Sequence, residues 1–301
     1  MAPRLTARFT GLALPALLLP SVAQATILYA LADFSNTGGT LYTIDTDTSA
    51  VNLVGTTTVA AGYGLADFNG RLFSYAQVDS DRVEELDPTT GATINTFDIG
   101  LDIIGEGAIS FDAAGNGFLA TAGINTPTGS IVSPSLYGFD IGAGTNNLIG
   151  QIGFVIDGLD FSPGGVLFGL RQNNPLLGGG GELHTISTAD AGTVFAGDTG
   201  VFGTSVSSAG LTFAGNDLFA IADDGNLFSV NPANGTSQLL FGTGLNNVSG
   251  LSALGVEVVP EPGLLALLGL GLVSLVALRR RQCRVESPSS AANDPRRQIT
   301  G

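Results

Sequence analysis

Three aspartates are the first candidates for chemistry in this 301-residue sequence. Asp67, Asp112 and Asp160 each lie in or just after a short apolar phrase that recurs along the chain. If the segments that carry them surround a common channel, their carboxylates could hold a calcium ion and activate a water molecule, as in a hydrolase or lactonase. Aspartates can also begin turns, because the carboxylate accepts hydrogen bonds from nearby backbone N–H groups. Both interpretations stay open from the residues alone.

The single histidine and the single cysteine limit other kinds of catalysis. His184 occupies the position that Tyr42, Tyr137 and Phe228 fill in sister segments, which favours a packed ring over a catalytic base. Cys283 lies near the C-terminus, so neither a Cys–His pair nor a three-His zinc site can form, and there is no G-x-S-x-G elbow. We therefore expect a protein that is not an enzyme and has no cofactor.

The remaining acidic residues fit turns better than metal sites. One position of the repeat opens a turn in four segments: Asp45, Asp87, Asp140 and Asn231. Asp45-x-Asp47 and Asp79-x-Asp81 lack the downstream glycine and glutamate of an EF-hand loop. No specific metal site is expected from them.

The elements that must position these residues repeat as a four-part phrase. The first parts are residues 64–67, 108–111, 158–161, 210–213 and 250–253. The second parts are 28–31, 72–75, 118–121, 167–170 and 218–221. The third parts are 41–44, 83–86, 136–139, 183–186 and 227–230. The fourth parts are 51–54, 93–96, 147–150, 193–196 and 238–241.

Each part has the length and composition of a β-strand, and four strands per unit of about 45 residues is typical of a propeller blade. The first unit begins at its second strand, and a lone first strand, residues 250–254, follows the last unit. That strand can complete the first blade and close the ring, which removes an exposed edge. The sequence thus predicts an all-β, five-bladed β-propeller over residues 26–258; a β-sandwich, a β-solenoid and a six-bladed ring are the alternatives.

The charge of this region excludes nucleic acid as a partner. Between Thr26 and Pro260 there are three basic residues, all arginine, against 23 acidic ones, a formal charge of −20. Binding to a polyphosphate requires clustered Lys and Arg.

The N-terminus has the order of a secretory signal peptide. Arg4 and Arg8 precede an apolar run, residues 11–19, and Ala23 and Ala25 provide the small residues of a cleavage site. A buried first helix is the alternative. We expect signal peptidase to cleave after Ala25 and exclude residues 1–25 from the fold.

The C-terminus carries a second signal in three parts. Pro260-Glu261-Pro262 is followed by an uncharged segment, residues 263–278, and then by Arg279, Arg280 and Arg281. A helix over this segment would be roughly 24 Å long, slightly short of the ~30 Å hydrocarbon core, so it could span a thinned bilayer. The arginines would stay in the cytoplasm and residues 26–260 would lie outside.

This order resembles the PEP-CTERM sorting signal of exported bacterial surface proteins. The resemblance implies that a membrane exosortase recognises residues 259–281, cuts near Pro260-Glu261-Pro262 and passes the protein outward. It implies a bacterial envelope and often a context of exopolysaccharide production, but no substrate. Chains of the family usually end just after the basic cluster, whereas this one continues through residues 282–301, which we expect to be disordered. A permanently anchored protein is the alternative.

One long connection between strands is a candidate binding surface. Residues 171–181 link a second to a third strand and begin with Arg171, Gln172, Asn173 and Asn174. Loops on one face of a propeller commonly bind partners. We expect an exported, acidic, non-catalytic surface or matrix protein whose loop contacts extracellular polysaccharide, with the calcium-dependent hydrolase as the alternative.

Overall fold

The computed structural model describes residues 26–35, 38–58, 62–76, 82–105, 107–125, 128–171, 181–200 and 209–254. These residues belong to one compact unit, residues 1–255. Their regular structure is entirely β, and no helix within these ranges could cross a membrane.

The strands form five antiparallel sheets, four with four strands and one with five, and in each sheet four strands run from an inner to an outer position. We number these sheets as blades 1 to 5 in chain order. From the axis outward, blade 1 has β21 (Gly250–Ser252), β1 (Ile27–Ser35), β2 (Gly38–Asp45) and β3 (Val51–Thr57). Blade 2 has β4 (Gly62–Phe68), β5 (Arg71–Ala76), β6 (Arg82–Leu86) and β7 (Thr93–Asp98). Blade 3 has β9 (Gly107–Phe111), β10 (Gly117–Asn125), β11 (Ser130–Asp140) and β12 (Thr145–Gln151), with an added short strand, β8 (Ile103–Ile104). Blade 4 has β13 (Ile156–Phe161), β14 (Leu167–Arg171), β15 (Glu182–Ile186) and β16 (Thr193–Asp198). Blade 5 has β17 (Ala209–Ala214), β18 (Asp217–Ala222), β19 (Asn226–Val230) and β20 (Ser237–Gly242).

The innermost strands form a closed ring. They contact one another in the cycle β4, β9, β13, β17, β21 and back to β4. This cycle confirms the predicted five-bladed β-propeller.

Blade 1 is built from both ends of the repeat region, as predicted. β21 pairs antiparallel with β1, with Leu31 opposite Gly250 and Tyr29 opposite Ser252. A strand close to the end of the described chain thereby completes a sheet that begins at its start. The pairing covers the edge of β1 that would otherwise be open and closes the ring.

The glycine of the inner-strand phrase allows neighbouring blades to approach closely. A Cβ added at Gly210 would lie 2.4 Å from the backbone nitrogen of Leu251, and one added at Gly250 would lie 2.6 Å from that of Leu65. Real Cβ atoms do not approach backbone atoms this closely. The recurring Gly-Leu pair is therefore a packing requirement at the axis.

The core lies between blades, because each blade buries its three inner strands against its neighbours. One cluster joins Phe168 and Leu170 of blade 4 to Leu218 and Ala220 of blade 5. The fourth strands are different, since their outward face meets solvent; Val194 in β16 is 67% exposed.

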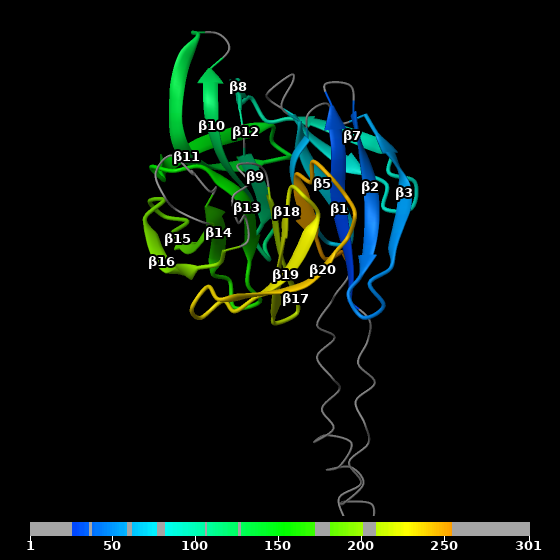
Figure 1. The fold of residues 1–301 in the computed structure, drawn as a ribbon. Helices are drawn as coiled ribbons and strands as arrows, with labels where there is room; N and C mark the ends of the chain where they lie inside the picture. Colours follow the sequence, from blue (N-terminus) through cyan, green and yellow to red (C-terminus); the bar gives the residue numbers. More distant parts are fainter. Residues whose placement is uncertain are drawn as a thin grey trace, which may run out of the picture. The chain divides into compact units, whose positions relative to one another are not determined.

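Blade 3 departs from the repeat in two ways. Gly117 stands where blades 2, 4 and 5 have a leucine, so the second strand is shifted by one residue relative to the predicted alignment of the repeats. The ring of Phe139 fills the space that a side chain at Gly117 would occupy. Its β10–β11 hairpin is extended and pairs with the unpredicted strand β8. Figure 1 shows this hairpin projecting beyond the other blades.

Strand polarity defines two faces of the ring. The loop face carries the connections between second and third strands, including the β10–β11 hairpin and the β14–β15 link. The turn face carries the turns between first and second strands and between third and fourth strands. β1 begins on this face, since Thr26 O accepts a hydrogen bond from Thr46 N in the β2–β3 turn. β21 ends on the same face, because it runs antiparallel to β1. The described chain thus enters and leaves the propeller on the turn face.

Candidate functional site

Several predicted functional residues lie outside the described residues. They are the cleavage-site residues Ala23 and Ala25, the loop residues Gln172, Asn173 and Asn174, and the sorting-signal residues Pro260, Glu261, Pro262, Arg279, Arg280 and Arg281. The boundaries predicted at residues 25/26 and 258/259 also involve such residues.

Two of the three candidate aspartates come together at the axis. Asp160 Oδ1 accepts a hydrogen bond from Ser110 Oγ of blade 3 (3.0 Å), and its Oδ2 accepts one from Thr212 Oγ1 of blade 5 (3.3 Å). Asp67 of blade 2 accepts a hydrogen bond from Ser252 Oγ of blade 1 (3.2 Å). These five residues, one from each blade, form what we call the axis ring.

The axis ring alters the acidity of its carboxylates. Burial raises the pKa of Asp160 to about 7; the hydrogen bond from the Phe213 backbone N–H opposes this shift, and the nearby charge of Asp67 adds to it. Burial also raises the pKa of Asp67, against the effect of its hydrogen bond from Ser252. Asp160 therefore exchanges a proton near neutral pH.

The third candidate, Asp112, lies elsewhere and holds a turn. Its Oδ1 accepts hydrogen bonds from the backbone N–H groups of Ala114 and Asn116, each 2.9 Å long. The three aspartates thus do not share one site, because the β9–β10 turn fully engages Asp112. Among the described residues no group of three or more His, Cys, Asp or Glu side chains could hold a metal ion.

The predicted turn residues do cap turns. Asp45 Oδ1 accepts hydrogen bonds from the backbone N–H groups of Asp47 and Thr48, and Asn231 Oδ1 accepts one from Ala233. Asp87 and Asp140 cap the equivalent turns of blades 2 and 3. These side chains are engaged in local backbone geometry.

Arg171 lies on the loop face, at the end of β14, with a fixed guanidinium. Its Nη1 lies 2.7 Å from Glu182 Oε2, and its Cζ lies 4.8 Å from the ring centroid of Phe154. Its side chain remains 29% exposed. Burial alone would raise the pKa of Glu182, but hydrogen bonds from His184 and Arg171 lower it. The residue predicted to begin a binding loop is thus held in place beside that loop.

His184 is a buried ring, as its repeat position indicates. It lies between Phe154 and Phe195, with ring centroids 4.6 and 5.6 Å away. Its Nε2 lies 2.9 Å from Glu182 Oε2, while its Nδ1 has no hydrogen-bond partner among the described residues. The ring helps to fix Glu182 and, through it, Arg171.

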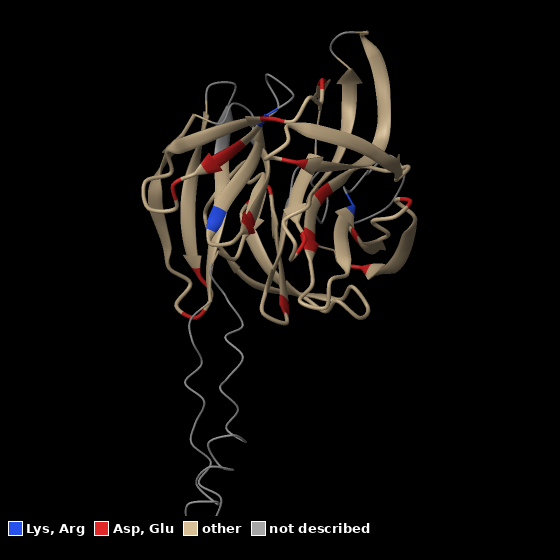
Figure 2. Cartoon of the chain, turned by 180° about the vertical axis from the view of Figure 1, so that it is seen from behind, with Lys and Arg blue, Asp and Glu red and all other residues tan. Residues whose placement is uncertain are grey.

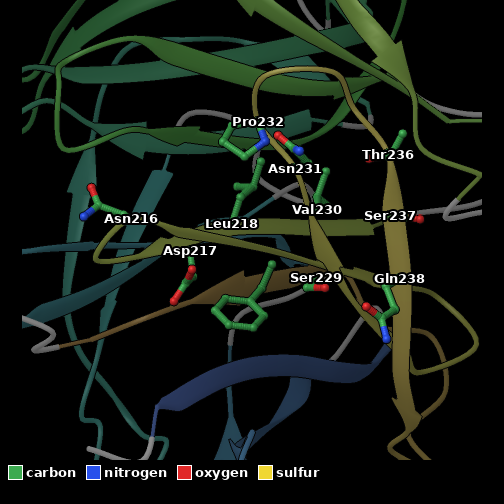
Figure 3. Close-up of a pocket in the computed structure, with 11 residues that line it drawn as sticks. Asn216, Asp217, Leu218, Ser229, Val230, Asn231, Pro232, Thr236, Ser237 and Gln238 are labelled. Carbon is green, nitrogen blue, oxygen red and sulfur yellow. The ribbon is translucent and has the colours of Figure 1, made fainter. Parts of the chain in front are cut away.

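Two grooves on the turn face were not predicted from the sequence. A groove of about 520 Å³ in blade 5 is lined by residues of β18, β19 and β20, and Figure 3 shows Asp217, Ser229 and Gln238 in it. A groove of about 480 Å³ in blade 3 is lined by residues of β10, β11 and β12. The same positions of the repeat line both grooves. The hydrophobic runs of the sequence do not show this correspondence, because it depends on which residues lie opposite one another in neighbouring strands.

Acidic residues outnumber basic ones in the described part of the chain. The ribbon of Figure 2, coloured by residue type, shows Asp and Glu positions spread over the blades and few Arg positions. The fixed guanidiniums of Arg71 and Arg171 each pair with a glutamate.

Comparisons with solved structures give distant likenesses. A structure of a nidogen/laminin complex has 14% identity and a TM-score of 0.46, covering 77% of this chain and 99% of that chain. Glutaminyl cyclase from Myxococcus xanthus has 17% identity and a TM-score of 0.43, covering 65% and 72% of the two chains. A Dos1 propeller has 14% identity and a TM-score of 0.37, covering 69% and 55%. The fold assignment rests on the strand pairing described above.

The family comparison concerns the C-terminus. No curated protein matches the sequence. Residues 258–281 match the PEP-CTERM protein-sorting motif, which confirms the resemblance seen in the sequence. The chain therefore carries the sorting motif of an exported exosortase substrate, attached to a five-bladed β-propeller.

Proposed function

We propose that this protein is a non-catalytic surface or matrix component that binds extracellular polysaccharide through its propeller. Signal peptidase removes residues 1–25, the helix over residues 263–278 holds the chain in the membrane with its N-terminus outside, and exosortase releases it near Pro260. The sorting motif at residues 258–281 supports the export step.

The axis ring supports a structural role for the carboxylates that would otherwise suggest an enzyme. Asp160 accepts hydrogen bonds from blades 3 and 5 through Ser110, Thr212 and the backbone of Phe213. Asp67 is bonded to Ser252 of blade 1. Both carboxylates join blades: Asp160 links the successive blades 3, 4 and 5, and Asp67 links blade 2 to the last strand of the repeat region in blade 1.

The fixed and partly exposed guanidinium of Arg171 is the observation that supports a polysaccharide as the partner. Its guanidinium is fixed on Phe154 and Glu182, yet its side chain is 29% exposed. The residues that follow it in the sequence, 172–174, all carry side-chain amides. A pre-ordered guanidinium loses little side-chain entropy when it binds. Its N–H groups are hydrogen-bond donors that suit the hydroxyl and carboxylate oxygens of a polysaccharide. This surface lies on the loop face, opposite the face on which the chain leaves the propeller.

A binding measurement with the mature protein tests this proposal. Its retention would be measured by co-sedimentation with extracellular polysaccharide purified from the host. We expect the wild type to bind, and Arg171→Ala to weaken binding about tenfold, as for the loss of one charge-assisted hydrogen bond. Arg82→Ala removes the same charge from blade 2 and is the matched control. Absence of binding by the wild type would refute the proposed function.

A second candidate function rests on Asp160. A carboxyl with a pKa raised to about 7 near the axis of a ring is typical of functional sites as well as of buried structural ones. A hydrolase that holds a calcium ion at the axis would need the carboxylates of Asp67 and Asp160 to bind the ion. Calcium titration followed by calorimetry, with Asp67→Asn as the variant, separates this candidate from the first.

A further inference from the structure

We propose that the two grooves of the turn face are equivalent sites for neutral saccharide units, and that the corresponding site in blade 2 is closed by Arg71. This inference rests on the proposed function for its partner class and adds a second contact surface, on the turn face, to the one at Arg171.

The cross-strand register shows that the blades share one site. In blade 5, Phe219 lies opposite Ser229, which lies opposite Gln238. Residues directly opposite in a sheet have their side chains on the same face. Asp217, two residues before Phe219, projects to that face too. Figure 3 shows Asp217, Ser229 and Gln238 in one row.

Blade 3 has the same row with smaller residues. Phe118 lies opposite Gly138, which lies opposite Asn147. A Cβ added at Gly138 would lie 3.0 Å from Asn147 Oδ1, so the amide of Asn147 lies over this glycine. Each groove thus combines one phenyl ring with one carboxamide.

Blade 2 shows what kind of chemical group fits in the space that is a groove in blades 3 and 5. Its row is Phe73, Glu85 and Asn95. Arg71, which corresponds to Asp217, lies with its Cζ 4.9 Å from the Phe73 ring centroid and donates hydrogen bonds of 2.7 and 2.6 Å to the two oxygens of Glu85. Asn95 Nδ2 donates a further hydrogen bond of 2.7 Å to Glu85. A planar hydrogen-bonding group therefore fits against the phenyl ring and between the strand side chains.

The exposed fractions of the phenyl rings agree with this comparison. Phe73 is 0% exposed beneath Arg71, whereas Phe219, Phe118 and Phe168 of blade 4 are 7%, 8% and 8% exposed. Blade 4 has the exposed ring position but ends its row in Val194 rather than an amide. In blade 3 the residue that corresponds to Arg71 is Asn116, whose amide donates a hydrogen bond to Asp112 within its own turn. The side chain of Asn116 therefore does not cover the ring of Phe118 as Arg71 covers that of Phe73.

The class of ligand follows from the residues that blades 5 and 3 have at the position of Glu85. Ser229 and Gly138 stand at that position, so neither groove has the buried carboxylate that balances a guanidinium in blade 2. Asp217, Ser229 and Gln238 line the blade 5 groove with carboxylate, hydroxyl and amide groups, and Asp140 and Asn147 line the blade 3 groove with a carboxylate and an amide. These donors and acceptors suit the hydroxyl groups at the rim of a sugar ring. The volumes of about 520 and 480 Å³ are within the range of small-molecule sites.

Two such sites on one face would act together on a polymer. A polysaccharide offers many copies of the same unit, so the second contact is intramolecular and raises the apparent affinity. Short oligosaccharides should bind each groove separately and more weakly.

The test closes one groove by copying blade 2 into blade 5. The variant Asp217→Arg with Ser229→Glu recreates the pair Arg71–Glu85 beside Phe219. The matched control introduces the same residues in blade 4, Val166→Arg with Thr185→Glu, where Val194 ends the row in place of an amide. The probe is a set of short neutral oligosaccharides made by partial acid hydrolysis of the host's extracellular polysaccharide, titrated into the mature protein by calorimetry.

We expect two oligosaccharides per chain in the wild type and in the blade 4 control, and one in the blade 5 variant. Should that variant fail to fold, Gln238→Ala with Asn147→Ala changes only exposed side chains and should weaken both sites about tenfold. Binding that is unchanged by these variants but lost in Arg171→Ala would overturn this inference and leave the proposed function standing. A wild type that binds neither oligosaccharide nor polymer would overturn both.

Discussion

The carboxylate of Asp160 in blade 4 accepts a hydrogen bond of 2.6 Å from the backbone N–H of Phe213 in blade 5. Its other oxygen accepts hydrogen bonds from Ser110 in blade 3 and from its neighbour Phe161. One side chain thus holds three successive blades together at the axis. Backbone donors on both oxygens explain why a carboxylate is suited to this position.

The free energy of unfolding should fall as the pH rises from about 4 to about 7, because of Asp160. Burial raises its pKa in the folded protein from 3.8 to about 7, so the folded state binds this proton more tightly than the unfolded state. Its contribution to stability is complete below about pH 4 and is lost as the pH rises through 7. Urea unfolding at a series of pH values should show this slope in the wild type.

The variant Asp160→Asn should flatten that part of the profile. Its overall stability should drop, because an amide –NH2 must face a backbone N–H of Phe161 or Phe213. An unchanged slope in this variant would assign the titration to another group.

Removing a hydroxyl of the axis ring should cost stability. Ser110 is buried, and Ser110→Ala deletes its hydrogen bond to Asp160. We expect a loss of about 1.5–3 kcal/mol in the free energy of unfolding, the range for hydrogen bonds to charged groups. Thr48→Ala, in the exposed β2–β3 turn, is the comparison and should change stability far less.

The inner-strand glycines should not tolerate a methyl group. Gly210→Ala would place its Cβ 2.4 Å from the Leu251 backbone nitrogen, so blade 1 must move away from blade 5. We expect a loss of more than about 3 kcal/mol or failure to fold, by thermal unfolding. At Gly164 the nearest atom is 3.8 Å away, so Gly164→Ala should be nearly neutral. Equal effects of the two substitutions would contradict the close approach of the blades.

Loss of Arg71 should expose the closed site of blade 2 at a cost in stability. Arg71→Ala leaves the buried carboxylate of Glu85 with Asn95 alone. Because the Arg71 side chain is 39% exposed, solvent screens the pair, and we expect a loss of about 1–2 kcal/mol. A double-mutant cycle with Glu85→Gln measures the coupling. A coupling energy near zero would show that the pair is not what holds Arg71 in place.

The mature protein should have defined ends. Intact mass and peptide mapping of the extracellular form should place its start at Thr26 and its end near Pro260, because the sorting motif covers residues 258–281. Replacing Arg279, Arg280 and Arg281 by glutamine should reduce release. A protein found only in membranes and ending at Gly301 would indicate permanent anchoring.

The sequence by itself determined the strands, the number of blades and the closure of the ring. Each blade has to bury the same kind of strand against the same kind of neighbour, so the Gly-Leu phrase and the apolar runs repeat at nearly constant spacing. The lone strand after blade 5 had only one unpaired partner, β1. The C-terminal signal was also readable, because its residues are contiguous.

Only the tertiary structure decided which side chains meet. Ser110, Asp160 and Thr212 lie about fifty residues apart and come together because inner strands converge on one axis. The register of β10 depends on Phe139 filling the space above Gly117, and a shift of one residue changes which side chains share a face. The grooves of blades 3 and 5, and the guanidinium that fills their counterpart in blade 2, follow from that register. Hydrophobic periodicity locates strands, whereas cross-strand packing decides their alignment.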